Sequence, residues 1–461
     1  MWIRYWRASA AALLIAITGC AGVPLESGQT QVAELVRARS GATVSAEPPT
    51  VEQAVRESLH EPLQVATAVQ IALQRNPTLQ IQFARLGLSA ADVFEASRLS
   101  NPGLSFAVLF PIGSASGNKL NAGATLSFSD LLLRSVRGRI AASEYRRTQE
   151  LVAASILDLT LDVQRAWFEC VGATQRAGVR QSIDESARSS TELADRYLQA
   201  GNIDQLMLQL HAAAASEAHI AARQAAADVA EASGRLRTLL GLNAADGPWS
   251  VPDAIPEPVT AEVDVPRLQT LALAQRLDLA AARSQVSAAE QQVTVAHRYR
   301  FLSPTGLGVA GEREADGSKR LGPSVSLSLP VFQQGQGAIA RAQAELVSAR
   351  ATQQLFEAQI SNEVQLQADR MRTAREQTTS YREGLIPQRE AVVARLQEKV
   401  NFMLTDAFSL LLARQQEYTA YLGYIDAMQA FWSARVELVR AVGARFPDDE
   451  TPAVKNPQVQ P

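Results

Sequence analysis

Aromatic residues, cysteines, net charge and long apolar runs are all scarce in this 461-residue chain. Aromatics make up 6% of the residues although 47% are apolar, which favours closely packed helices over a bulky globular core. A net charge of −3 supplies no field to attract nucleic acid, which argues against a function through a basic patch. No apolar run beyond the N-terminus reaches about 18 residues, which excludes a transmembrane helix. Such a chain can cross a membrane only with strands.

The first residues have the pattern of a secretion signal. Two arginines precede a short apolar core, and Ile17-Thr18-Gly19-Cys20 closes it. The closing segment resembles the bacterial lipobox, which implies that residues 1–19 are removed and that Cys20 is acylated. Ala21 stands where an aspartate would retain a lipoprotein at the inner membrane, so the outer membrane is the expected destination. Cys170 then has no disulfide partner and is expected to be a small buried apolar residue.

The second half of the chain repeats the first at an offset of about 200 residues. Each copy is expected to run helix, two short strands and then very long helices. The aligned identities are few, and the shared order of elements carries the inference. An offset of 201 places Leu126-Ser127 on Leu327-Ser328, Ala141 on Ala342, Glu144 on Glu345 and Val163-Gln164 on Val364-Gln365.

The expected domain organisation follows this duplication. In the first repeat the strands are expected at about 103–130 and the long helices at about 136–240; in the second, at about 305–332 and 337–442. Asn76-Pro77 is expected to break the first helix. The expected segments are a signal at 1–19, a lipid-anchored tether at 20–60, repeat 1 at 61–247, a Pro-rich linker at 248–266, repeat 2 at 267–447 and a flexible tail at 448–461.

The expected strands have one apolar and one hydroxylated face. In the second copy, Val325, Leu327, Leu329 and Val331 are interleaved with small or polar residues, mostly serines. Four such strands are too few to close a barrel, and open sheet edges are not tolerated in lipid. Three chains would supply twelve strands, with the serines lining a water-filled lumen. Two hairpins of a soluble protein are the alternative, but they do not explain helices of roughly 60 residues, about 90 Å long.

Four segments carry a family resemblance: Ala72–Leu79, Ser324–Gly335 with its Leu-Pro-Val-Phe, Ala200–Ile203 at a helix turn, and Asn401–Glu417. Together with the order of the elements, they resemble the TolC-like outer-membrane efflux family from about Leu63 to Ala444. The resemblance implies a mainly α fold in which three chains form a 12-stranded β-barrel on a 12-helix α-barrel. It also implies a homotrimer in outer-membrane lipid that works with a periplasmic membrane-fusion adaptor and an inner-membrane pump of the RND or ABC type.

The resemblance places the turns of the two long helical pairs at a periplasmic tip that meets the adaptor and closes the channel. The candidate tip residues are Gly201, Asn202 and Asp204 in the first turn and Asn401, Met403 and Asp406 in the second. The two aspartates are candidates for gating or pore-lining acids, and ordinary helix capping is the alternative. The pattern departs from the family at Met207, where many members have aspartate, and at Phe402, where glycine is common.

No catalytic or cofactor-binding motif stands out. Residues 335–340 match a dinucleotide-binding pattern, but the expected helix continues for some 60 residues with no strand after it. Its glycines are therefore assigned to the turn from strand to helix. The four histidines lack metal-ligand spacing and are expected on the surface or in the lumen. No enzyme activity, cofactor or metal is expected.

The leading hypothesis is a passive, trimeric outer-membrane exit channel of a tripartite efflux or type I secretion system. It would carry substrates from the pump and adaptor to the exterior. The alternatives are a lipid-anchored periplasmic coiled-coil protein without a pore and, more distantly, a periplasmic enzyme. The closing segment is similar to that of members from heavy-metal efflux systems, while a drug or small organic molecule stays open as the substrate.

Overall fold

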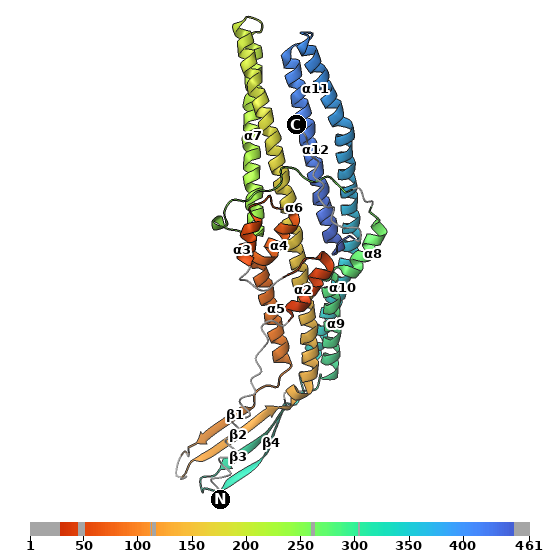
Figure 1. The fold of residues 1–461 in the computed structure, drawn as a ribbon. Coiled ribbons are helices and arrows are strands. Elements are labelled where there is room, and N and C mark those ends of the chain that lie inside the picture. Colours follow the sequence, from red (N-terminus) through yellow and green to blue (C-terminus); the bar gives the residue numbers. More distant parts are fainter. Residues whose placement is uncertain are drawn as a thin grey trace. The chain divides into compact units, whose positions relative to one another are not determined.

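A computed structural model describes residues 28–44, 51–110, 112, 117–259, 263–302 and 305–446. The fold is mainly helical, with one four-stranded antiparallel sheet in the order β1-β2-β3-β4 (Figure 1). Two compact units are present. Unit 1 is built mainly from Phe83–Gln149 and Ala281–Gln353, and unit 2 from the described parts of Val32–Gln82, Glu150–Ala280 and Gln354–Pro461. None of the described helices is both long and apolar enough to cross a bilayer.

Both halves contain the same order of elements, which confirms the expected duplication. The first half comprises α4 (Val65–Arg75), α5 (Pro77–Ala96), β1 (Gly103–Leu109), β2 (Lys119–Ser127), α6 (Phe128–Gln199) and α7 (Gln205–Leu239). The second comprises α8 (Val265–Gln275), α9 (Leu277–Arg298), β3 (Thr305–Arg313), β4 (Lys319–Leu327), α10 (Gln336–Thr379), the π-helix η2 (Ser380–Leu385), α11 (Ile386–Asn401) and α12 (Ala407–Val442). The strands end at Ser127 and Leu327, a few residues before the expected 130 and 332, and α6 begins directly after β2.

In the first half, the junction between α4 and α5 rests on the C-terminal end of α7, within unit 2. Asn76 separates the two helices and Pro77 begins α5, as the Asn-Pro pair predicts. The buried Asn76 side chain donates from Nδ2 to the Leu239 carbonyl oxygen in the last turn of α7, at 2.8 Å. Gly241 follows with a φ of +68°, and a Cβ there would lie 2.6 Å from the Arg75 carbonyl oxygen. Position 241 therefore requires glycine, both for its left-handed backbone conformation and for its close approach to Arg75.

In the second half, the junction between α8 and α9 contacts the end of α12 in the same way, but through different side chains. Arg276 takes the place of Asn76 and donates from Nη1 to the Ala441 carbonyl oxygen at 3.3 Å, while Gly443 ends α12 with a φ of +72°. Arg276 also pairs with Asp278 at 2.7 Å and with Glu363 at 2.6 Å. Burial alone would lower the pKa of Arg276, but the hydrogen bonds to the two carboxylates outweigh it and raise the pKa above its ordinary value.

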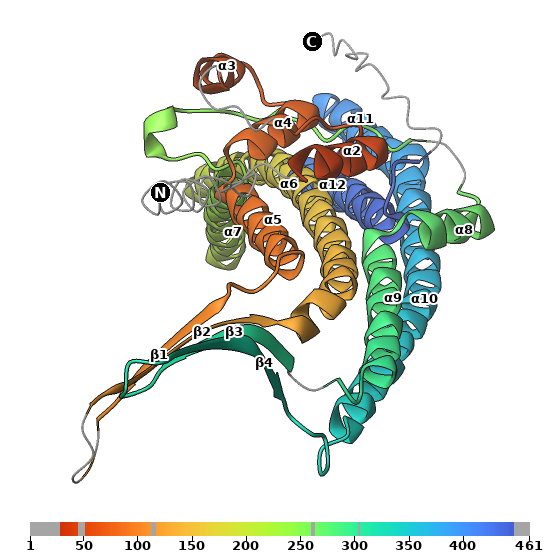
Figure 2. The ribbon, with the colours of Figure 1, turned by 90° about the horizontal axis from the view of Figure 1, so that it is seen from below.

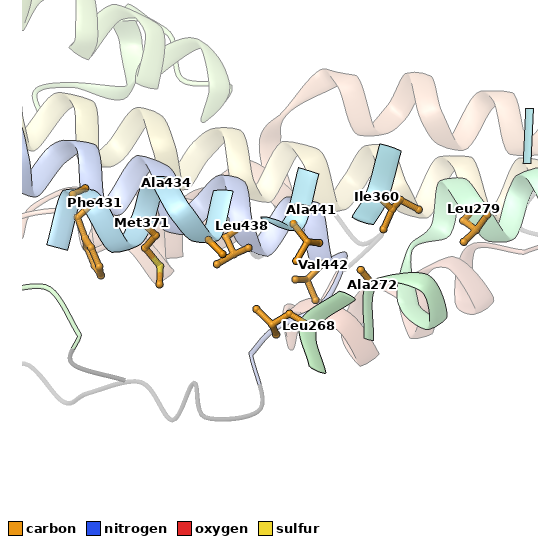
Figure 3. Close-up of a cluster of buried hydrophobic side chains, with 13 residues drawn as sticks. Leu268, Ala272, Leu279, Ile360, Met371, Phe431, Ala434, Leu438, Ala441 and Val442 are labelled. Atoms are coloured by element: carbon orange, nitrogen blue, oxygen red, sulfur yellow. The ribbon is translucent and has the colours of Figure 1, made fainter. Parts of the chain in front are cut away.

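The helices of unit 2 pack through a seam of small and aliphatic side chains (Figure 3). Along α10 and α12 the seam residues recur every three or four positions, which keeps one stripe of each helix against its neighbours. Alanines in the stripe allow close helix packing, consistent with the scarcity of aromatics. The buried members are Leu268, Ala272, Leu279, Ile360, Val364, Ala368, Met371, Ala374, Phe431, Ala434, Leu438, Ala441 and Val442.

The described parts of the expected tether and linker are more ordered than their sequences indicate. Residues 20–60 include α2 (Gln29–Ser40) and α3 (Val51–Ser58), and Val32 and Val36 of α2 are fully buried. In the linker, Ile255 is buried and the Trp432 indole donates to the Pro256 carbonyl oxygen at 2.8 Å. The linker therefore packs against α12, and Arg39 of α2 donates to the Gln275 carbonyl oxygen of α8 at 2.8 Å.

Pro387 interrupts the second long helix, as expected, and the chain absorbs it with a π-helix. Proline lacks an N–H and crowds the preceding turn. In η2 the Ile386 N–H donates to the Tyr381 carbonyl oxygen, five residues back, which widens the helix just before the proline. Gly423 of α12 makes room for this bulge, because a Cβ there would lie 2.5 Å from the Tyr381 hydroxyl.

Candidate functional site

The four strands of unit 1 lie side by side in one sheet (Figure 2), and their register gives this sheet two unlike faces. Residues paired across strands share a face, so the faces follow directly from the register. One face carries small and polar residues that include Ser105, Asn121, Thr125, Ser127, Glu312, Arg320, Ser324 and Ser326. The other face, here called the apolar face, ends in Arg313 and Lys319 at the β3–β4 turn. Its apolar residues are Leu104, Phe106, Val108, Leu120, Ala122, Ala124, Leu126, Leu307, Val309, Leu321, Val325 and Leu327.

The apolar face is uncovered within the described chain. Phe106 is 75% exposed, Leu321 80% and Val325 68%. A continuous exposed apolar surface of this kind marks contact with lipid or with another protein. The outer strands β1 and β4 each have one neighbour in the described sheet, so each leaves a row of backbone groups without a strand partner. The sheet is thus incomplete as a single copy.

The turns that join the long helices in unit 2 share one backbone design. In both, a residue in the left-handed region donates its N–H to the carbonyl three residues earlier, at 2.9 Å, and the next N–H bonds five residues back, at 2.8 Å. The left-handed residue is Gly201, with φ +73°, in the first turn and Met403, with φ +54°, in the second. Met403 is the only non-glycine residue with positive φ in the described ranges. In the second turn, the residue that stands where the first turn has glycine is therefore Met403 rather than Phe402.

Met403→Gly is expected to stabilise the second turn. A left-handed residue with a Cβ costs about 1–2 kcal/mol, and the extra chain entropy of glycine offsets part of the gain, which leaves about 0.5–1 kcal/mol. The measurement is the thermal unfolding midpoint followed by far-UV circular dichroism, which should rise. The control is Phe402→Gly, whose φ of −91° needs no glycine and whose midpoint should fall. A midpoint that falls for Met403→Gly would contradict the assignment of strain to this residue.

The aspartates that follow the turns cap the next helices. Asp204 accepts a hydrogen bond from the Met207 N–H at 2.9 Å and caps α7. Asp406 accepts from the Ser409 N–H at 2.8 Å and from its hydroxyl at 2.7 Å, and caps α12. The hydrogen bonds from Ser409 lower the pKa of Asp406 below its ordinary value. Helix capping accounts for both positions, and a gating role is a further proposal.

The apices of the turns are exposed and partly apolar. In the second turn, Phe402 and Leu404 are strongly exposed, and Met403 is 93% exposed. Asn401 accepts a hydrogen bond from the Gln397 side-chain amide at 3.1 Å. Asn202 is also exposed. Each set of expected tip residues is therefore brought together within its own turn.

An aromatic contact between the two helical hairpins was missed by the sequence analysis. Phe408 of α12 stacks on His211 of α7, with 4.4 Å between ring centroids, and meets the edge of Tyr197 of α6 at 5.5 Å. The Nδ1 atom of His211 is 3.0 Å from the Ser190 hydroxyl, and its Nε2 atom is buried without a hydrogen-bond partner. His211 is half-buried among these side chains. Its stacking partner is about 200 residues away, so no local pattern reveals it.

The two cysteines and the metal-ligating residue types add no further candidate site within the described residues. Cys170 is buried, as expected, and burial raises the pKa of its thiol. Cys20, the expected acylation site, lies outside the described residues. Within the described ranges, no group of three His, Cys, Asp or Glu side chains could hold a metal ion.

Comparison with solved structures identifies the fold. A membrane protein from Pseudomonas aeruginosa matches with a TM-score of 0.68 and 19% identity, over 82% of this chain and 93% of its own. The CmeC outer membrane channel of Campylobacter jejuni matches with a TM-score of 0.69 and 18% identity, over 82% and 85%. The chain has the TolC-like fold. The outer membrane protein VceC of Vibrio cholerae also matches, with a TM-score of 0.67 and 17% identity, over 83% and 96%.

The TolC-like fold is shared with little sequence identity. No protein-family model and no curated protein sequence matches the chain. Helix stripes and strand alternation specify apolar positions rather than particular residues, so this fold tolerates extensive substitution. The TolC-like resemblance of the sequence is confirmed at the level of the fold.

Proposed function

We propose that three copies of the chain form a passive outer-membrane exit channel of a tripartite efflux or type I secretion system. The observation that carries this proposal is a four-stranded sheet with one exposed apolar face and two unpaired edges. Lipid suits the apolar face, but each unpaired backbone group costs several kcal/mol in lipid. Pairing β1 of one copy with β4 of the next removes both edges, and three copies give twelve strands. The polar face then lines the lumen.

The proposed channel receives its substrate from an inner-membrane pump of the RND or ABC type through a periplasmic membrane-fusion adaptor. Structures of the same fold are described as outer membrane channels from Campylobacter jejuni and Neisseria gonorrhoeae, which supports this role. The transport work comes from the pump, and the chain acts as a duct rather than an enzyme. A lumen of serine, threonine and small residues with a few charges, such as Glu312 and Arg320, would offer little shape selection among substrates.

The two turns form the proposed periplasmic tip, which meets the adaptor and gates the channel. The contact that would have to change on opening is the packing of Phe408 against His211 and Tyr197, because it joins the two helical hairpins of one chain. The proposed tip residues are Gly201, Asn202, Asp204, Asn401, Met403 and Asp406.

Asp406→Asn separates capping from gating. Asparagine caps a helix about as well as aspartate, whereas Asp406→Ala should cost about 0.5–2 kcal/mol of unfolding free energy. Because the folded pKa of Asp406 is lowered, its contribution to stability is present above the ordinary aspartate pKa and is lost as the pH falls through the folded value. Asp406→Asn removes that pH dependence, which thermal unfolding measures. A gating carboxylate predicts altered single-channel conductance in Asp406→Asn, and unchanged conductance would contradict it.

A lipid anchor at Cys20 completes the proposed localisation in the outer membrane, with the long helices in the periplasm. Its support is the lipobox-like Ile17-Thr18-Gly19-Cys20 and the absence of aspartate at position 21. Acyl chains on Cys20 would hold each copy at the membrane before the sheet is completed.

Conductance in planar bilayers tests the proposed function. Purified protein should insert and give uniform conductance steps of one water-filled pore. Protein that binds membranes through its anchor but gives no conductance would favour the periplasmic coiled-coil alternative.

A further inference from the structure

Exposed arginines gather where the helices of unit 1 join the sheet. Two segments carry most of them, residues 131–142 at the start of α6 and residues 291–302 around the end of α9, and neither contains an acidic residue. All of these arginine side chains are exposed. This arginine cluster consists of Arg98, Arg134, Arg137, Arg139, Arg298 and Arg300.

Exposed apolar side chains accompany the arginine cluster at the same junctions. Leu99 is 40% exposed, Leu131 47% and Phe301 53%. This mixture is typical of the boundary between lipid and water, because arginine can bury its aliphatic stem while its guanidinium stays among the headgroups. Phosphates are the anionic groups at that depth of a bilayer. The inference therefore rests on the proposed entry of the sheet into the outer membrane.

The members of the cluster differ in whether a carboxylate compensates their charge. Arg137 pairs with Asp130 at 2.8 Å. Arg139, in contrast, makes no side-chain ion pair or hydrogen bond with any residue of the described ranges. Arg298 lies near the Tyr299 ring, with 5.8 Å from the guanidinium carbon to the ring centroid, and has no ion pair within the described part of the chain. A charged donor without a carboxylate partner is available for an external anion.

Arg139 and Arg298 line a cavity of about 230 Å³ between α6 and α9. Thr294 also lines it, and its hydroxyl already donates to the Glu290 carbonyl oxygen at 2.9 Å. The carboxylate in the wall, Glu290, is already paired with Arg350 at 2.8 Å. The lining is thus positively charged and rich in hydrogen-bond donors, which suits a phosphate diester.

We propose that this cavity binds the phosphate of a membrane phospholipid headgroup through Arg139 and Arg298. A bound headgroup would hold the junction of sheet and helices at the surface of the inner leaflet. The channel would then be kept at a constant depth by a specific contact as well as by its apolar face.

The test is the binding of phosphatidylglycerol to the purified, detergent-solubilised full chain, followed by native mass spectrometry. The double variant Arg139→Gln/Arg298→Gln should bind at least tenfold more weakly than wild type. The matched control is Arg372→Gln/Arg395→Gln, which removes the same charge from two exposed arginines of unit 2 and should bind like wild type. Equal affinity of the cavity variant and wild type would overturn the proposal.

Two further measurements identify the ligand and separate a failure of this inference from a failure of the proposed function. Inorganic phosphate should compete only weakly, and uncharged diacylglycerol should not bind. Competition by phosphate as strong as by lipid would overturn the lipid assignment. The cavity variant should still assemble and conduct in planar bilayers. If it conducts normally and also binds phosphatidylglycerol as tightly as wild type, only this inference is contradicted. Failure of wild type to assemble or conduct contradicts the proposed function instead.

Discussion

Val325→Arg is expected to prevent assembly of the channel in the outer membrane, whereas Ser324→Arg, one residue away, is expected to leave assembly intact. The two residues lie on opposite faces of β4. Val325 is cross-strand from Leu307 on the apolar face, and Ser324 lies on the polar face opposite Gly308. Arginine on a lipid-facing position costs about 2–4 kcal/mol near the bilayer midplane. Three copies would multiply this to about 6–12 kcal/mol for one assembled channel.

The measurement for this pair is membrane fractionation combined with the heat-sensitive migration of the assembled protein on a gel. Val325→Arg should lack the band of the assembled protein. Ser324→Arg should keep that band and should change the ion selectivity of the channel, because its charge faces the lumen. Normal assembly of Val325→Arg would show that the apolar face does not meet lipid. Equal loss in both variants would show that the strand tolerates no arginine on either face.

Gly241→Ala is expected to cost about 2–5 kcal/mol of unfolding free energy. The left-handed conformation accounts for about 1–2 kcal/mol. The rest comes from the new Cβ, which would lie 2.6 Å from the Arg75 carbonyl oxygen, so the α4–α5 junction must move away from α7. That movement also stretches the Asn76 hydrogen bond to the Leu239 carbonyl oxygen.

Gly201→Ala is the matched control for this prediction. Gly201 has a similar φ of +73°, but a Cβ there has no neighbouring atom within 4 Å, so only the conformational cost of about 1–2 kcal/mol applies. Denaturant unfolding of both variants, followed by circular dichroism, gives the difference. Equal losses would show that the close approach to Arg75 carries no stability.

The architecture could be predicted from sequence because its signals are local and repeated. The alternation of Val325 and Leu327 with serines specifies a two-faced strand without any knowledge of its neighbours. Asn76-Pro77 ends one helix and begins the next because proline forbids helix continuation. Gly241 marks the end of α7 for the same kind of local reason.

Contacts between distant segments could not be predicted in this way. His211 stacks on Phe408 across the two hairpins, and nothing near either residue signals the other. Met403 adopts a left-handed conformation that its side chain disfavours, because the surrounding turn imposes it. The helix that buries Val32 and Val36 is short and polar, so its stability comes from packing rather than from its own sequence.

The number of chains in one assembled particle tests the central claim most directly. Native mass spectrometry of the protein extracted from membranes should give three copies of the chain, since three copies of a four-stranded sheet close into twelve strands. The same preparation should conduct in planar bilayers. A particle of one or two chains, or a trimer whose sheets can be deleted without loss of assembly, would contradict the account.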